Sequence, residues 1–178
     1  AMSMADRICV LDRGHVQQVD TPDEVYNRPV NTFVATTVGM PPMNLVPVRV
    51  EGENGRVQLA AASFSLGAAL DSRVESIAAH AGQELQIGVR PEDIRVGADA
   101  SEAALRCRVI AVEPLGGEAI IDLDLDGKIV KAMTPPDVEF RPDEVIPVAF
   151  DLSRIHLFEA NGPSLYAADG TSAFATVP

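Results

Sequence analysis

The sequence has few of the residues on which several classes of protein depend. It has no Trp, two Tyr and six Phe, so it offers few of the rings on which single-stranded nucleic acid stacks. Basic residues are also scarce, with 14 Lys and Arg against 26 Asp and Glu and a formal net charge of −12. Such a charge repels phosphate backbones and anionic lipids. We therefore expect no nucleic-acid partner.

Cysteines and long apolar runs are equally scarce. Cys9 and Cys107 lie far apart and form no Cys-x-x-Cys pair, so neither a disulfide framework nor a zinc site is indicated, and we expect both to be small buried residues. No apolar run approaches the roughly 20 residues that span a bilayer, and the start lacks the pattern of a signal peptide. These absences favour a cytoplasmic location. Because the start runs directly into a strand-like segment, we also expect a piece of a longer protein.

The first 40 residues have the pattern of a hairpin and two short helices. Apolar runs at residues 7–11 and 16–19 predict the two strands of the hairpin. Thr21 and Glu24 then predict a capping box at the start of a helix, which Pro29 must end.

A second helix is predicted between Asn31, a residue that caps helices, and Gly39, a residue that ends them. Its apolar stripe consists of Val30, Phe33, Val34 and Val38. If this part packs on an absent part of a longer protein, the stripe loses its cover here. A bare stripe predicts self-association, an exchanged element or disorder.

After Pro41-Pro42 the apolar residues change from helical spacing to alternation, so we place a domain boundary there. Alternation gives each strand one dry and one wet face, and the number of short strands favours a small β-barrel. Residues 71–80 offer only a weak helix. The predicted strands lie at residues 45–50, 57–59, 85–89, 105–109, 121–125, 128–132, 145–150 and 155–158.

Residues 87–96 and 148–157 form a faint internal repeat. Each reads as a strand, a tight corner and another strand, with apolar residues at matching places. Chance similarity between apolar segments is the alternative. If the repeat is real, it implies two related halves within one β-rich unit.

Catalytic and metal-binding patterns are missing. Gly127-Lys128 lacks the other residues of a phosphate-cradling loop, the three histidines have no metal-ligand spacing, and the serines lie in no nucleophile elbow. Residues 122–127 imitate the start of a calcium loop, but its twelfth place is Met133 instead of Glu. We therefore interpret residues 122–127 as a solvated strand face that enters a hairpin.

The most informative polar cluster contains Arg90, Pro91, Glu92 and Asp93. A guanidinium at a tight corner either forms an ion pair that fixes the corner or presents itself to a partner. We prefer the ion pair. The other candidate corner contains Gly116 and Gly117. With Leu115 they faintly imitate the Leu-Ser-Gly-Gly-Gln signature with which ABC ATPases bind a phosphate at the start of a helix. A strand-like run follows here instead of a helix, so we interpret the two glycines as a turn between strands.

Four motifs carry a resemblance to a known family. They are Pro41-Pro42-Met43-Asn44-Leu45, Gly88-Val89-Arg90-Pro91-Glu92, Pro114-Leu115-Gly116-Gly117-Glu118 and His156-Leu157-Phe158. In this order they resemble the C-terminal regulatory domain, called the transport-associated OB or TOBE domain, of the ATP-binding subunits of maltose-type and glycerol-phosphate-type ABC importers.

The resemblance implies a mainly β fold, in which an OB-like barrel follows a small α+β remnant of the nucleotide-binding domain. It divides the chain into residues 1–40 of that remnant, residues 41–162 of the OB-like regulatory domain, and a tail of residues 163–178. Arg90, Pro91, Glu92, Gly116 and Gly117 become candidates for an interface or a structural corner. The resemblance assigns no catalytic, cofactor-binding or metal-binding residue to this chain.

The resemblance also implies partners. The chain would be no enzyme itself, while its parent would bind ATP and Mg²⁺ and hydrolyse ATP. The expected partners are a second copy, the nucleotide-binding domain of its own chain, permease subunits and a regulatory protein, at the inner face of the cell membrane. The alternative is an independent MOP-like barrel, similar to the molybdate-binding domains, that senses an oxyanion or another small ligand. Arg90, Arg106 and Arg108 are the candidate donors for such a ligand.

Overall fold

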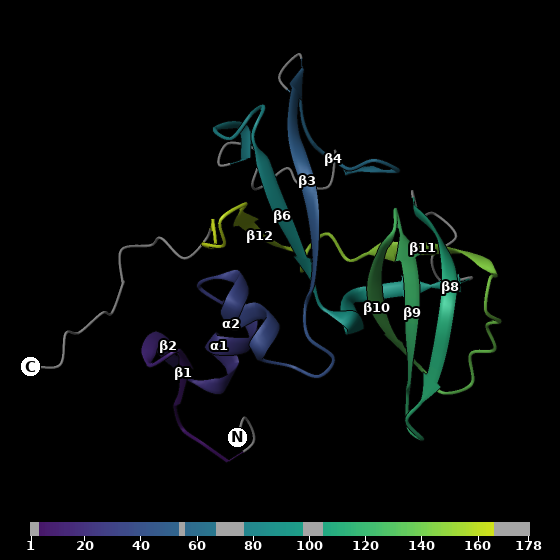
Figure 1. Cartoon of the computed structure of the whole chain (residues 1–178), viewed down its shortest axis with the longest axis horizontal. Helices are drawn as coiled ribbons and strands as arrows, with labels where there is room; N and C mark the ends of the chain where they lie inside the picture. The colour runs from purple at the N-terminus through teal and green to yellow at the C-terminus, as the bar shows by residue number, and fades with distance from the viewer. Residues whose placement is uncertain (1–3, 54–55, 67–76, 98–104, 166–178) are drawn as a thin grey trace, which may run out of the picture.

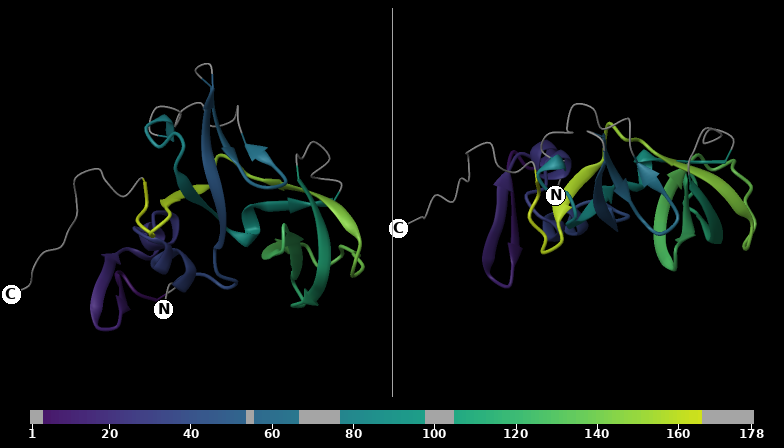
Figure 2. Two further views of the ribbon diagram at one scale, coloured as in Figure 1. Left: turned by 45° about the horizontal axis from the view of Figure 1, so that its top comes forward. Right: turned by 90° about the horizontal axis from the view of Figure 1, so that it is seen from above.

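The computed structural model describes residues 4–53, 56–66, 77–97 and 105–165 and arranges them in three parts along its long axis (Figure 1). An antiparallel hairpin with two short helices lies at one end, one five-stranded sheet lies in the middle, and a second five-stranded sheet lies at the other end. Figure 2 shows the same order from two further directions. The fold is mainly β, as predicted.

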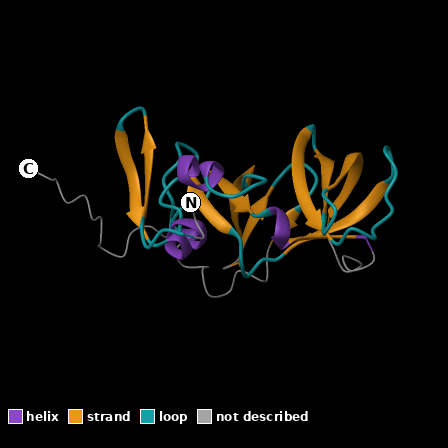
Figure 3. Cartoon of the chain, turned by 90° about the horizontal axis from the view of Figure 1, so that it is seen from below, coloured by secondary structure: helices purple, strands orange, loops and turns teal. Residues whose placement is uncertain are grey.

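The N-terminal part contains the predicted hairpin and both predicted helices. β1 (Ile8–Asp12) pairs with β2 (His15–Asp20), and α1 (Pro22–Asn27) and α2 (Thr32–Thr37) follow. Figure 3 shows these two helices between the hairpin and the middle sheet. Asn31 caps α2, because its Oδ1 accepts the Val34 N–H at 2.9 Å.

Only half of the predicted capping box forms. Thr21 Oγ1 accepts the Glu24 N–H at 3.3 Å, but the Thr21 N–H donates to Asp20 Oδ1 at 2.9 Å. The Glu24 carboxylate instead lies 3.6 Å from the Arg28 guanidinium. An adjacent aspartate therefore replaces the return bond that the sequence predicted.

The prediction of a bare stripe on α2 is wrong. Val34 and Val38 are buried in a small cluster with Val10 and Val25, and Val30 and Phe33 are partly buried against it. The hairpin and α1 supply the cover within this chain. The two cysteines differ from each other: Cys107 is buried as predicted, but Cys9 is exposed on the hairpin.

The middle sheet has the strand order β12-β6-β3-β4-β5. All its neighbouring strands are antiparallel. Its strands are β3 (Asn44–Glu53), β4 (Arg56–Ala60), β5 (Ser65–Leu66), β6 (Glu84–Val89) and β12 (His156–Glu159). The two-residue β5 was not predicted, because it is too short to show alternation. Most of the weak helix predicted at residues 71–80 lies outside the described residues.

The end sheet has the order β10-β9-β8-β11-β7. Its strands are β7 (Ile94–Val96), β8 (Leu105–Pro114), β9 (Ala119–Leu125), β10 (Lys128–Thr134) and β11 (Val145–Phe150). The edge strand β10 curves back toward β7 at the opposite edge and toward η2, a 3₁₀ turn at Pro91–Asp93. Residues 122–127 form the end of β9 and its hairpin turn, as interpreted from the sequence.

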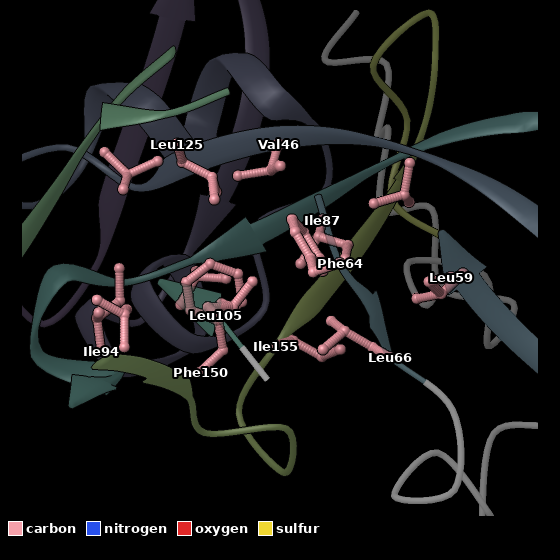
Figure 4. Close-up of a cluster of buried hydrophobic side chains, with 14 of the residues drawn as sticks. Val46, Leu59, Phe64, Leu66, Ile87, Ile94, Leu105, Leu125, Phe150 and Ile155 are labelled. Atoms are coloured by element: carbon pink, nitrogen blue, oxygen red, sulfur yellow. The ribbon is translucent and has the colours of Figure 1, made fainter. Parts of the chain in front are cut away.

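One hydrophobic core joins the two five-stranded sheets. Figure 4 shows its side chains pointing toward one another from both sheets, with Val46 and Ile87 from the middle sheet and Leu105 and Leu125 from the end sheet. Phe64 and Phe150 meet edge to face with ring centroids 6.0 Å apart, a favoured arrangement for aromatic pairs. The two sheets are therefore stabilised by shared burial.

The internal repeat corresponds to two strand–corner–strand units that pair with each other. Residues 87–96 pass from β6 of the middle sheet through η2 to β7 of the end sheet, and residues 148–157 make the reverse passage from β11 to β12. β6 pairs with β12 and β7 pairs with β11, both antiparallel. The predicted halves thus cross between the sheets side by side, with an approximate local two-fold relation.

Gly88 provides a test of the packing between β6 and β12. An added Cβ would lie 2.5 Å from Met43 Sδ and 2.7 Å from Phe158 Cε2. We expect Gly88→Ala to lower the free energy of unfolding by about 1–3 kcal/mol, because overfilled cores strain their neighbours. Urea unfolding measures this change.

Gly117→Ala is the matched control, because an added Cβ at Gly117 meets nothing within 4 Å. This substitution should change the free energy of unfolding by no more than about 1 kcal/mol. Equal effects at the two glycines would contradict the packing explanation.

Candidate functional site: the junction around Arg90

Three of the four sequence motifs meet where β6 leaves the middle sheet. Gly88 of β6 lies opposite Leu45 of β3 on one side and His156 of β12 on the other. Met43 and Phe158 pack together with Ala35 of α2 in a small buried cluster. Motifs that are more than 100 residues apart therefore form one junction between the N-terminal part and the two sheets.

Arg90 is the centre of this junction. Its side chain is 2% exposed. Nη1 donates to the carbonyl oxygen of Val38 at 2.6 Å and to that of Ala35 at 3.3 Å, and Nη2 donates to the Tyr26 carbonyl at 2.7 Å. These carbonyls belong to the last turns of α1 and α2, where acceptors lack partners within their helix and carry partial negative charge. One guanidinium therefore caps both helices.

Tyr26 and Glu92 enclose the guanidinium. The Arg90 guanidinium carbon lies 3.8 Å from the centroid of the Tyr26 ring, within the range of a cation–π contact. The Tyr26 hydroxyl donates to Glu92 Oε1. Burial, followed by the Glu92 hydrogen bond, raises the pKa of Tyr26 to about 12, against the opposing effect of Arg90.

The ion pair predicted at this corner is wrong in its partners. Arg90 contacts neutral carbonyls and a ring, its Nε has no hydrogen-bond partner, and burial lowers its pKa. The carboxylate that forms an ion pair is Asp93, whose Oδ1 lies 2.7 Å from Arg154 Nε. The sequence pattern placed Arg90 at a structural corner, but it could not show which cation the neighbouring acids face.

Pro91 and Asp93 shape the corner itself. Pro91 is buried and begins η2, where its fixed φ suits the turn. The Asp93 N–H donates to the Arg90 carbonyl at 3.0 Å, and the Asp151 N–H donates to the Asp93 carbonyl at 2.9 Å. Since Asp93 and Arg154 occupy equivalent places in the internal repeat, their ion pair links its two corners.

Gly39 provides the space for the guanidinium. Its φ is +106°, and an added Cβ would lie 2.9 Å from Arg90 Nη1 and 3.2 Å from the Tyr26 ring. A side chain at this position would therefore be strained and would displace Arg90. The sequence predicted Gly39 only as a helix stop, since its second role depends on a residue 51 positions away.

Asn44 joins the junction to the end sheet. Its Nδ2 donates to the carbonyls of Val89 at 3.1 Å and Lys131 at 2.9 Å, and its Oδ1 accepts the Lys131 N–H at 2.7 Å. Lys131 lies on β10, an edge strand of the end sheet. The Asn44 amide thus satisfies edge groups that a neighbouring strand would otherwise pair.

Gly116 and Gly117 lie outside this junction. They form the turn between β8 and β9, in which the Leu115 N–H donates to the Glu118 carbonyl at 2.8 Å. Gly116 has a φ of +87°, which explains a glycine there. The predicted turn is confirmed, and the structure does not bring it together with the Arg90 corner.

The arginines named as oxyanion donors do not converge. Arg90 is buried in the junction, whereas Arg106 and Arg108 are exposed on β8 of the end sheet. Arg108 forms ion pairs there with Asp124 at 2.7 Å and with Asp143 at 3.5 Å. A cleft of about 580 Å³ beside η2 is lined by Arg95 but also by Glu92, Asp137 and Glu139. Its excess of carboxylates makes it unsuitable for an anion.

Among the described residues, no group of His, Cys, Asp and Glu is arranged to hold a metal ion. Within the same residues, no helix has the length and apolar character needed to cross a membrane.

Two family models match the chain, and Arg90 lies in the segment where the two matches overlap. The MalK OB fold domain matches residues 39–94, and the TOBE domain matches residues 87–158. The chain belongs to this TOBE and MalK OB-fold family. Three of the four motifs from which the resemblance was inferred lie at the junction just described.

Curated relatives show where this family occurs. The sulfoquinovosyl glycerol transport ATP-binding protein SmoE of Agrobacterium fabrum is 37% identical over 90% of this chain and 43% of its own length. The trehalose/maltose import ATP-binding protein MalK of Thermococcus litoralis is 37% identical over 89% of the chain and 44% of its own length. The sn-glycerol-3-phosphate import ATP-binding protein UgpC of Cereibacter sphaeroides is 37% identical over 90% and 42%. The chain thus spans less than half the length of these relatives.

A solved structure of the cytoplasmic molybdate-binding protein ModG aligns with 65% of this chain and 95% of its own chain. Its TM-score is 0.48 and its sequence identity is 16%. This likeness carries no argument about a ligand.

Tyr26 gives a pH test of the junction. We expect its hydroxyl to titrate near pH 12 in the folded chain and near pH 10 in urea. The measurement is the phenolate absorbance of the chain minus that of Tyr26→Phe, recorded as the pH is raised. Because the folded pKa is raised, the folded state holds the proton more tightly. This contribution to stability is complete below about pH 10 and is lost as the pH rises through 12.

Glu92→Gln tests the cause of the shift. The amide still accepts a hydrogen bond but carries no charge, so the Tyr26 midpoint should fall below its wild-type value and stay above 10, because burial, the largest cause, is unchanged. An unchanged midpoint in Glu92→Gln would show that the charge of Glu92 makes no contribution to the pKa of Tyr26.

Proposed function

We propose that this chain is the regulatory and dimerising domain of the ATP-binding subunit of an ABC importer for a sugar, a polyol or a glycerol phosphate. The junction around Arg90 is the observation that carries this proposal. There the family motifs of the OB and TOBE regions bind the ends of two helices from residues 4–38, so that the N-terminal part is held against the sheets. Relatives named for carbohydrate and glycerol-phosphate transport support the substrate class.

Residues 1–40 belong, in this proposal, to the nucleotide-binding domain of the longer protein. Their hairpin exposes an apolar face: Cys9 lies opposite Val19 and Leu11 lies opposite Val16, and all four side chains are exposed. A two-stranded hairpin with such a face is marginal by itself. We infer that this face packs on the rest of the nucleotide-binding domain.

The remaining assignments follow from the same proposal. ATP and Mg²⁺ would bind in the longer protein and not in this chain. The partners would be a second copy, the permease subunits and a regulatory protein, and the subunit would lie at the inner face of the cell membrane.

The direct test is the size of the native gene product. An antibody raised against this chain should detect, in source cells, a polypeptide much heavier than 18.9 kDa that hydrolyses ATP after purification. A product at 18.9 kDa without ATPase activity would contradict the proposal.

Val16→Ser tests the assignment of the hairpin. In this chain Val16 is exposed, so the substitution should change the free energy of unfolding by less than about 0.5 kcal/mol. In the longer subunit the same substitution should destabilise by about 1–3 kcal/mol, because it removes one buried methyl group and replaces the other with a hydroxyl. Thermal unfolding of both proteins measures the difference, and the chain by itself is the control. Equal effects would mean that the hairpin face is free in both.

The second candidate, an independent oxyanion sensor, is weaker because its donors do not converge. Molybdate, sulfate and phosphate at 1 mM to 10 mM should leave the melting temperature unchanged. A true ligand at a hundred times its Kd would add about 2.7 kcal/mol to the free energy of unfolding. A clear rise with one anion would favour the sensor.

A further inference from the structure

We infer that Arg90, Tyr26 and Glu92 form a reversible clasp, from which the hairpin and the two helices, residues 8–38, release as one unit while the two five-stranded sheets stay folded. The release is a property of this chain. Its use to transmit regulation between the nucleotide-binding domain and the regulatory domain rests on the proposed function.

The first argument is that the N-terminal part and the sheets have separate cores. Val10, Val25, Val34 and Val38 form their own cluster, while the large core draws its residues only from the sheets and the loops between them. Among the described residues, the buried apolar cluster that joins the two consists of Ala35, Met43 and Phe158. Separation would therefore leave both larger cores intact.

The second argument is the small number of described polar contacts across the boundary. At the C-terminal ends of α1 and α2, these are the three bonds from Arg90 and the Tyr26–Glu92 bond. At the other end of α2, the Thr32 N–H donates to the Gly162 carbonyl at 2.8 Å, and the Ser164 N–H donates to the Val30 carbonyl at 2.9 Å. The clasp thus holds one end of α2 and a short backbone pairing holds the other.

The third argument concerns the buried charge. Arg90 is 2% exposed, yet its acceptors are neutral carbonyls, and its Nε has no partner. Glu92 and Asp93 act on this charge only through space, without an ion pair, and loss of hydration offsets much of the gain from hydrogen bonds when a charge is buried without a directly bonded counter-charge. On release the guanidinium regains water, so release requires less free energy than unfolding of the sheets.

The fourth argument is the connection. Residues 39–43 join α2 to β3, with Gly39 in the left-handed region and Met40 93% exposed. Met40 therefore makes little packing that release would have to break, and Gly39 accepts backbone angles closed to other residues.

Native-state amide hydrogen exchange in low urea tests the clasp in this chain. The helix amides of Val25, Arg28, Ala35 and Val38 donate within their own helices, and helices of six residues open readily once they lose their packing on the sheets. We therefore expect these amides to exchange from the released state with one opening free energy, below that of the amides of β6 and β8. Arg90→Lys should accelerate exchange of these four amides at least tenfold and leave β6 and β8 unchanged, because one ammonium lacks the planar fork that reaches two helices.

Arg108→Lys is the matched control, since Arg108 is a half-exposed arginine in ion pairs on the end sheet. It should leave exchange in residues 22–38 unchanged. Tyr26→Phe, which keeps the ring and removes only the bond to Glu92, should give a smaller acceleration of the same amides. It keeps the test valid if Arg90→Lys fails to fold.

Two results would overturn the inference. One is equal acceleration of the helix amides and the sheet amides, which would mean that the chain opens as a single unit. The other is unchanged exchange of residues 22–38 in both Arg90→Lys and Tyr26→Phe. Neither result depends on ATP hydrolysis, so failure of the clasp and failure of the proposed function are distinguishable.

Discussion

The arrangement of this chain depends on one buried guanidinium. Arg90 leaves the end of β6 and reaches carbonyls in the last turns of both α1 and α2, so it joins two helices to a sheet with which they share little apolar packing. The nearby features serve this contact: Gly39 leaves room for the side chain, Tyr26 covers it, and Glu92 orients Tyr26. A lysine could not replace this geometry.

The two sheets are held together differently, by a shared core and by chain segments that pass between them. Residues 87–96 and 148–157 cross in opposite directions and pair along both strands, and the Asp93–Arg154 ion pair joins their corners. Asn44 adds a link from β3 to the edge of β10. These contacts make the sheets one body, whereas the N-terminal part is attached at fewer points.

This difference suits a regulatory domain in an importer subunit. The two sheets can stay folded while the N-terminal part changes its position relative to them, because the two parts open with different free energies. The family motifs concentrate at the boundary between the two, with the exception of the Gly116–Gly117 turn. In our proposal, the exposed apolar face of the hairpin contacts the rest of the nucleotide-binding domain.

The sequence by itself determined the local structure: alternation determined the long strands, Asn31 and Gly39 the ends of α2, and Gly116 a turn, because each depends on neighbours within a few residues. It also showed the family through ordered motifs. Only the tertiary structure decided the partners of Arg90, the exposure of Cys9, the cover of Val34 and Val38, and the role of Asn44. These depend on groups up to 87 positions away, and no local pattern specifies which distant carbonyl or carboxylate a side chain meets. The five-residue motif around Arg90 marked the place, and folding chose the contacts.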